Sequence, residues 1–174
     1  QPPEGFCAPL EERLEGIWDD ATKEAIAERY EVGPLRGQQW WKFEEGFLDG
    51  WVSDWSRIYD ESCEDEWTTD LPRFSLRQTC LDQRMVEIET RVRLLEDLDQ
   101  GVRAELGVQN YAPYVVPTEC EDDSLVSAVV LYPSDPTERQ EFLDVMLEFR
   151  LSYALTVAAF FGGTPEAYEG AFAR

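Results

Sequence analysis

Four cysteines are the residues whose type and spacing permit the most definite chemistry in this chain. They are Cys7, Cys63, Cys80 and Cys120 in a sequence of 174 residues without histidine. A zinc site would need all four thiolates, and no two of them have the close spacing usual for zinc ligands. The even number favours two disulfides over four buried thiols, and two disulfides indicate an oxidising compartment.

The lack of histidine also excludes Ser-His and Cys-His catalytic pairs. No phosphate-binding glycine loop and no HRD or DFG kinase motif occurs. Carboxylate clusters such as "CEDEW", "ECEDDS" and "EDLDQ" are expected by chance among 37 acidic residues, and none has the EF-hand spacing. Calcium bound by "ECEDDS" is a minor alternative. We therefore expect no enzyme activity, no catalytic or metal-binding residue and no cofactor in this fragment.

The chain is strongly acidic, with 15 Lys and Arg against 37 Asp and Glu and a net charge of −22. This charge argues against nucleic acid and anionic lipid as partners, because both require a cationic surface. A solvated surface, as in a salt-adapted organism, is favoured over an acidic site for a cationic ligand. The start "QPPEGF" lacks the features of a signal peptide, and no stretch is long and apolar enough to span a bilayer. We expect membrane attachment only through a span outside this fragment.

Hydrophobic periodicity predicts three long helices in the first part of the chain. The first runs from Pro9 to Gly33, the second from about Gln38 to Cys63, and the third from an N-cap at Ser75 to about Gly107. Gln78 completes a capping box with Ser75. The second helix carries an aromatic stripe that we interpret as core packing rather than a ligand cage. The predicted apolar faces contain Leu10, Leu14, Ile17, Trp18, Ala21 and Ala25, then Trp40, Phe43, Phe47, Trp51, Trp55 and Ile58, then Leu81, Met85, Ile88, Val92, Leu95 and Val102.

The helical pattern breaks between Val108 and Pro133, where three prolines exclude one long helix. In this segment "DDSLVSAVV" fits a short helix capped by Asp122 or Asp123 better than a strand. A new helix is expected with Asp135 as N-cap, followed by Pro136 and Glu138 in the first turn. It ends at Gly162 and Gly163, and "TPEAYEGAFAR" opens another helix with Thr164 as cap and Pro165 first. Such a hairpin is the unit of helical repeat proteins.

These patterns predict an all-α fold. Residues 1–133 would form a sensor-like or linker-like bundle of three long antiparallel helices, with an irregular proline-rich segment at 108–133. Residues 134–174 would form the helical hairpin, similar to a first tetratricopeptide unit. The chain would be stapled by disulfides.

Bundle geometry gives a preferred disulfide pairing among the three that four cysteines allow. The end of the second helix should lie beside the start of the third, so we predict a Cys63–Cys80 bond contributing ~3 kcal/mol by chain entropy. Cys7 then pairs with Cys120, which the proline-bearing segment carries back along the bundle. The alternative pairs Cys7 with Cys63 and Cys80 with Cys120, because the first three cysteines share one end of the bundle.

Five stretches occur in the order seen in one known family: "CAPLEERLEGIWDD", "FLDGWVSDWSRIYDESCEDEW", "FSLRQTCLDQRM", "PTECED" and "YPSDPTERQEF". They resemble the segment that follows the kinase domain and transmembrane helix in tetratricopeptide-containing bacterial Ser/Thr protein kinases, which are abundant in myxobacteria. The likeness covers residues 7 to about 163. The residues that carry it are Cys7, Gly16, Trp18, Asp19, Trp55, Cys63, Arg77, Cys80, Leu81, Cys120, Asp135 and Pro136.

The resemblance implies the extracytoplasmic, periplasmic part of a membrane-anchored kinase, placed between the membrane span and tetratricopeptide repeats. The expected function is a non-catalytic sensor or scaffold module that binds a peptide, a protein or a small ligand. The alternative is a free-standing secreted or periplasmic binding or structural protein. The heavy acidity and the weak repeat signature of "YALTVAAFFGGTPEAYEGAF" depart from the family. None of the kinase's catalytic residues has a counterpart in this fragment.

Overall fold

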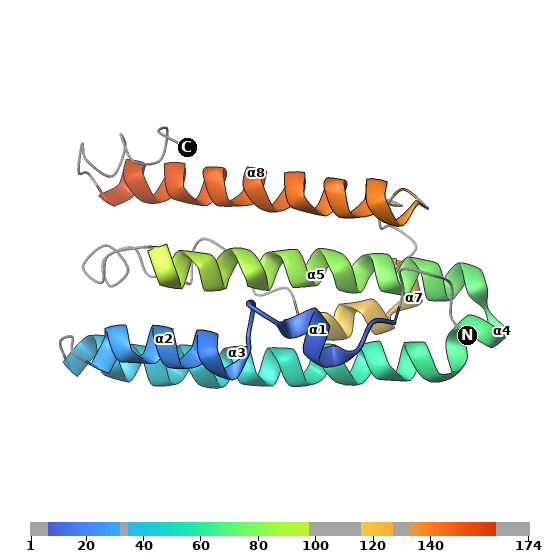
Figure 1. Ribbon diagram of the computed structural model, residues 1–174, viewed down its shortest axis with the longest axis horizontal. Coiled ribbons are helices and arrows are strands. Elements are labelled where there is room, and N and C mark those ends of the chain that lie inside the picture. The colour runs from blue at the N-terminus through green and yellow to red at the C-terminus, as the bar shows by residue number, and fades with distance from the viewer. Residues whose placement is uncertain (1–6, 32–34, 98–115, 127–132, 134, 163–174) are drawn as a thin grey trace.

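The computed structural model describes residues 7–31, 35–97, 116–126, 133 and 135–162 (Figure 1). These residues are mostly helical and contain no strand, which confirms the all-α prediction. The elements are α1 (Leu10–Leu14), α2 (Asp20–Glu31), α3 (Leu35–Glu61), the π-helix η1 (Ser62–Glu66), α4 (Trp67–Thr69), α5 (Leu71–Asp97), the 3-10 helix η3 (Pro117–Glu121), α7 (Asp123–Val126) and α8 (Pro136–Gly162).

The long helices lie side by side in layers (Figure 1). α2 packs against α3, α3 against α5, and α5 against α8. α3 runs opposite to α2 and α5, whereas α8 runs in the same direction as α5. The 3-10 helix η3 contacts both α3 and α5. The division at residue 133 stays a prediction, and the predicted hairpin partner at 164–174 lies outside the described residues.

The first predicted helix is broken at Gly16, whose φ of +70° belongs to the left-handed region that favours glycine. Asp19 then caps α2: one carboxylate oxygen accepts from the Thr22 amide at 2.8 Å and the other from the Gly16 amide at 2.7 Å. The break shifts the helical register. Thr22, Ile26 and Tyr30 are therefore buried in α2, whereas the predicted Ala21 and Ala25 are exposed.

Replacing Asp19 with alanine should lower the free energy of unfolding by about 1 kcal/mol, because both amides lose their acceptor. The hydrogen bonds from Gly16 and Thr22 hold the pKa of Asp19 below its usual range. A lowered folded-state pKa stabilises the fold above the unfolded-state pKa, and this contribution is lost as the pH falls through the folded-state pKa. Urea unfolding at several pH values measures it. Asp19→Asn is the control, since it keeps an acceptor without a titrating group; equal pH dependence in this variant and the wild type would contradict the assignment.

The third long helix begins earlier than predicted. α5 starts at Leu71, where Asp70 Oδ1 accepts from the Arg73 amide at 3.1 Å. Ser75 lies inside this helix, and its carbonyl accepts from the Thr79 hydroxyl at 2.9 Å, so the predicted capping box is wrong. The residues preceding α5 are themselves helical in η1 and α4, which leaves only Asp70 as a break. The predicted end of this helix near Gly107 lies outside the described residues.

Helix starts in the later part of the chain agree with the sequence pattern. Asp122 Oδ1 accepts from the Ser124 amide at 2.8 Å at the start of α7, so a short helix is confirmed for residues 123–126, and the rest of the predicted segment, 127–130, lies outside the described residues. Asp135 Oδ1 accepts from the amides of Thr137 and Glu138 at 2.9 and 3.1 Å at the start of α8.

The aromatic stripe of α3 is mostly core. Trp51 and Trp55 are 4% and 0% exposed, which supports packing over a ligand platform. At the start of the stripe the prediction was one position off, because Trp41 is buried, Trp40 is only partly buried and Phe43 is 58% exposed. The other predicted core residues that are buried are Trp18, Ile58, Leu81, Met85, Ile88, Val92 and Leu95, and Leu10, Leu14, Ile17 and Phe47 are partly buried. Val102 lies outside the described residues.

Candidate functional site

All four cysteines form disulfides, but the preferred pairing was wrong. The structure joins Cys7 to Cys63 and Cys80 to Cys120, each with a Cα–Cα distance of 5.7 Å. This is the alternative pairing of the sequence analysis. The reason is the side of α5 that each residue faces. Cys63, in η1 after α3, lies beside Gln78, whose Nε2 is 3.7 Å from the Cys63 sulfur. Cys80 stands two positions further, about 200° around the helix, and there it meets Cys120 of η3.

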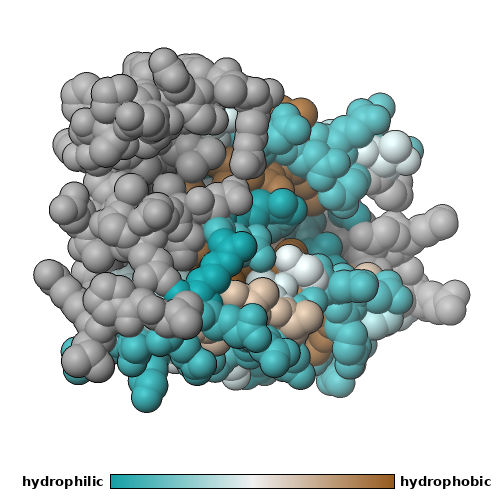
Figure 2. All heavy atoms as spheres, turned by 60° about the vertical axis from the view of Figure 1, so that its left-hand side comes forward, coloured by the Kyte–Doolittle hydropathy of each residue, from teal (hydrophilic) through white to brown (hydrophobic). Residues whose placement is uncertain are grey.

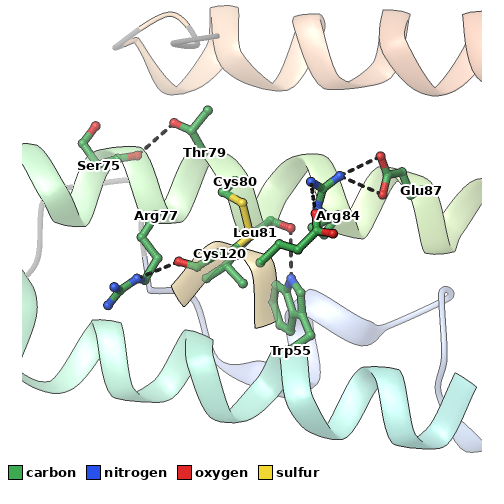
Figure 3. Close-up of a disulfide and its surroundings, with 10 residues drawn as sticks. Trp55, Ser75, Arg77, Thr79, Cys80, Leu81, Arg84, Glu87 and Cys120 are labelled. Atoms are coloured by element: carbon green, nitrogen blue, oxygen red, sulfur yellow. Dashed lines mark hydrogen bonds and ion pairs between the residues drawn. A yellow bond between two sulfur atoms is a disulfide. The ribbon is translucent and has the colours of Figure 1, made fainter. Parts of the chain in front are cut away.

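The Cys80–Cys120 disulfide holds η3 against the middle of α5 (Figure 3). Both residues are buried, at 2% and 0% exposure. Beside them the Arg77 Nε donates to the Cys120 carbonyl at 3.0 Å, and Trp55 Nε1 donates to the Leu81 carbonyl at 2.9 Å. The bond, the arginine and the tryptophan together fix η3, α5 and α3 to one another.

Ion pairs reinforce the position of η3. Arg57 in α3 binds both carboxylate oxygens of Glu121 at 3.1 Å, and these bonds hold the pKa of Glu121 below its usual range. Arg84 in α5 bridges Glu119 at 3.2 Å and Glu87 at 3.0 Å (Figure 3 shows the Glu87 pair). The 3-10 helix is thus attached to α3 through one arginine and to α5 through another.

The Cys7–Cys63 disulfide ties the start of α1 to the turn after α3. Tyr59 supports the same junction, since its hydroxyl donates to the Ala8 carbonyl at 2.9 Å. Burial raises the pKa of this phenol. Both cysteines are only partly buried. This disulfide is therefore more accessible to reductant than Cys80–Cys120.

Graded reduction should open the two disulfides in order. A thiolate must reach the sulfur along the line of the bond, so we expect Cys7 and Cys63 to be alkylated at lower dithiothreitol concentration than Cys80 and Cys120. Mass spectrometry of the alkylated digest at each concentration measures this. Simultaneous labelling of all four cysteines under native conditions would contradict the difference in burial, and a peptide linking Cys63 to Cys80 before reduction would contradict the pairing itself.

A cleft of about 290 Å³ lies where α1 and the residues after it meet α5 and α8. Its apolar lining includes Ile17, Met85 and Val86 from the bundle side and Leu143 and Leu147 from α8. The cleft is thus walled on one side by the disulfide-tied part of the chain and on the other by a single long helix. Such concave sites between helices are common places for small ligands.

Carboxylates outnumber cations around this cleft. The two guanidinium groups are already paired, Arg13 with Asp82 at 2.5 Å and Arg93 with Glu89 at 2.7 Å. The remaining acids in the lining are Glu12, Glu15 and Asp144, which form no ion pair among the described residues. Asp144 Oδ1 accepts from the side-chain Nε2 of Gln140 at 2.9 Å. Three carboxylates of the cleft therefore have no cationic partner among the described residues, and apolar side chains lie beside them, which suits an organic cation.

Arg13 is the residue that connects the cleft to the core. It reaches from α1 to the nearly buried Asp82 on α5 and lies 5.6 Å from the ring centres of both Trp55 and Tyr59. This arrangement combines an ion pair with cation–π contacts. Sequence reasoning missed the cleft residues. The available signal was Asp82, an acid placed directly after Leu81 on the apolar face of a predicted helix.

In the part of the chain that the structure describes, no group of three or more cysteine, aspartate or glutamate side chains is placed to hold a metal ion. None of the described helices is long and apolar enough to cross a bilayer. Comparison of the chain with protein-family models, with curated proteins and with solved structures found no match.

Proposed function

We propose that this chain is a non-catalytic extracytoplasmic sensor or scaffold domain of a membrane-anchored bacterial Ser/Thr protein kinase. Two disulfides in a small helical protein support a non-reducing compartment outside the cytoplasm. The ordered likeness of five sequence stretches to the kinase family supports the parent protein. The tetratricopeptide-like hairpin belongs to the same proposal.

The observation that carries the sensor role is the cleft between the disulfide-tied bundle and α8. A sensor needs a site at which a ligand contacts two elements at once, so that binding changes how they sit together. Here α1 is fastened through Cys7–Cys63, whereas the described part of α8 is fastened to α5 by packing and by the Arg150–Glu87 pair at 3.1 Å. The ligand class that fits is a small organic cation with an apolar part.

Ligand binding can be tested with the purified domain and a panel of small organic amines and guanidines. Thermal shift and calorimetry should detect saturable binding of cations, and not of size-matched neutral or anionic compounds. Glu12→Gln or Asp144→Gln should weaken it about fivefold, the effect of one partly exposed ion pair. Glu28→Gln on α2 makes the same change of charge on an exposed residue outside the cleft lining and serves as the control. Binding that responds equally to all three variants would reflect net charge alone and would remove the sensor role from the cleft.

The kinase placement needs a separate test, because ligand binding is equally compatible with a free-standing periplasmic protein. The coding sequence upstream of Gln1 should encode an apolar span preceded by kinase motifs. In intact cells, Cys7 and Cys63 of the full-length protein should become labelled by a membrane-impermeant maleimide after mild reduction. A cleavable signal peptide directly upstream would instead identify a secreted or periplasmic binding or structural protein.

A further inference from the structure

α8 has a second apolar face that points away from α5. Val145, Phe149 and Tyr153 follow one another at four-residue spacing and are 64%, 72% and 64% exposed. Phe142, one turn earlier, is 38% exposed. Residues spaced in this way form a single stripe along a helix.

The opposite face of the same helix is the one that packs. Leu143 and Leu147 line the cleft beside α5, and Arg150 pairs with Glu87 of α5. In Figure 1, α8 lies at one edge of the stack of described helices, opposite the edge formed by α2 and α3. On the face that Figure 2 shows, the described residues are mostly hydrophilic, and hydrophobic side chains gather between the levels of α8 and α5. A helix that is apolar on two faces is suited to lie between two layers, and the described residues supply only one of them.

The charge of the side chains beside the stripe indicates which kind of surface can pack against it. The exposed charged side chains beside the stripe are acidic: Glu138, Glu141 and Glu148. A second copy of this chain would bring these carboxylates together and would add another net charge of −22. Like charges facing each other across an interface oppose association. The complementary surface is therefore apolar and basic.

We propose that the outer face of α8 docks an amphipathic helix of another polypeptide, with apolar residues at three- and four-residue spacing and lysine or arginine beside them. The apolar side chains lie along Val145, Phe149 and Tyr153, and the basic ones reach the acidic flank. This is the helix-against-helix mode of peptide recognition, in which a few aromatic anchors carry most of the affinity. The surface is separate from the cleft. Peptide binding there would show that residues 164–174 do not cover this face of α8 as a hairpin partner, whether or not the parent protein is a kinase.

The test uses the full chain and a synthetic helical peptide built from leucine and lysine. Fluorescence anisotropy should show saturable binding of this peptide, and no binding of a leucine–glutamate peptide with the same apolar pattern or of a scrambled leucine–lysine peptide. Phe149→Ser should weaken binding about tenfold, as expected for a central aromatic anchor. The matched control is Phe43→Ser, because Phe43 on α3 is also exposed, at 58%, and carries the same side chain. Circular dichroism establishes that both variants remain folded.

Several outcomes would overturn this proposal. The first is absence of binding, and the second is equal binding of the scrambled peptide. The third is equal weakening by Phe43→Ser and Phe149→Ser, which would indicate attraction to charge without a defined face. A dimer in sedimentation velocity that Phe149→Ser dissociates would make a second copy the occupant. Association with lipid vesicles that Phe149→Ser abolishes would make it a membrane surface.

Discussion

Replacing Glu44 with glutamine is expected to lower the free energy of unfolding by about 3–5 kcal/mol, the usual cost of removing one partner of a buried ion pair. Glu44 in α3 is fully buried and Arg91 in α5 is 2% exposed, and the Arg91 Nε donates to Glu44 Oε1. The Arg91 guanidinium also lies 5.2 Å from the ring centre of Phe47. Without the carboxylate, a positive charge would remain in the core.

The measurement is urea unfolding followed by circular dichroism with both disulfides intact. Arg93→Gln is the control, because Arg93 lies two positions further along α5 and is 49% exposed in its pair with Glu89. It should cost less than about 1 kcal/mol. Replacing both partners by apolar residues, Glu44→Leu with Arg91→Met, should recover most of the loss. If Glu44→Gln were as mild as Arg93→Gln, the two charges would not be buried together as the structure places them.

This ion pair also marks the limit of what the sequence could predict. The helical class, the aromatic core of α3 and the Asp135 cap were readable because each depends on local spacing. The pairing of Glu44 with Arg91 could not be predicted, because the two residues lie on different helices, each among many other charged residues. Arg91 also stands four positions after Glu87, a spacing typical of an exposed ion pair along one helix. In the structure Glu87 pairs with Arg84 and Arg150 instead.

The start of the first helix shows a different limit. The apolar residues from Leu10 to Ala25 fit one continuous helix, so periodicity alone gave no sign of a break. The break occurs because Gly16 takes a positive φ. In addition, the Asp19 carboxylate accepts hydrogen bonds from the backbone amides of Gly16 and Thr22. Two polar side-chain bonds therefore outweigh the continuity of the pattern, and they shift the buried face from Ala21 and Ala25 to Thr22 and Ile26.

The candidate cleft could not be predicted because its walls come from segments far apart in the chain. Arg13 and Asp82 are 69 positions apart, and Asp144 lies on a third element. Each of them is one charged residue among many in the chain, and nothing in the sequence marks the three as members of one site. The disulfide pairing failed for a related reason, since the sequence did not show which side of α5 each cysteine faces. Gln78 contacts Cys63, whereas Cys80, two positions further and about 200° around the helix, meets Cys120.

Removing the Cys80–Cys120 bond by the double substitution Cys80→Ala with Cys120→Ala should lower the free energy of unfolding by about 4 kcal/mol. The bond closes a loop with a sequence separation of 40, for which chain entropy gives about 4 kcal/mol. The Cys7–Cys63 bond has a separation of 56 and the same estimate of about 4 kcal/mol. Chain entropy alone thus predicts nearly equal losses for the two double variants.

Packing predicts unequal losses, and this difference is what the experiment resolves. Cys80 and Cys120 are 2% and 0% exposed, so alanine leaves unfilled space between α5 and η3. Cys7 and Cys63 are partly exposed, so the same change there opens space that water can enter. We therefore expect the Cys80–Cys120 variant to be the less stable of the two, by about 1 kcal/mol. Urea unfolding of both variants measures the difference. A greater loss for the Cys7–Cys63 variant would mean that loop length, and not the burial of the sulfur atoms, sets what each bond contributes to this fold.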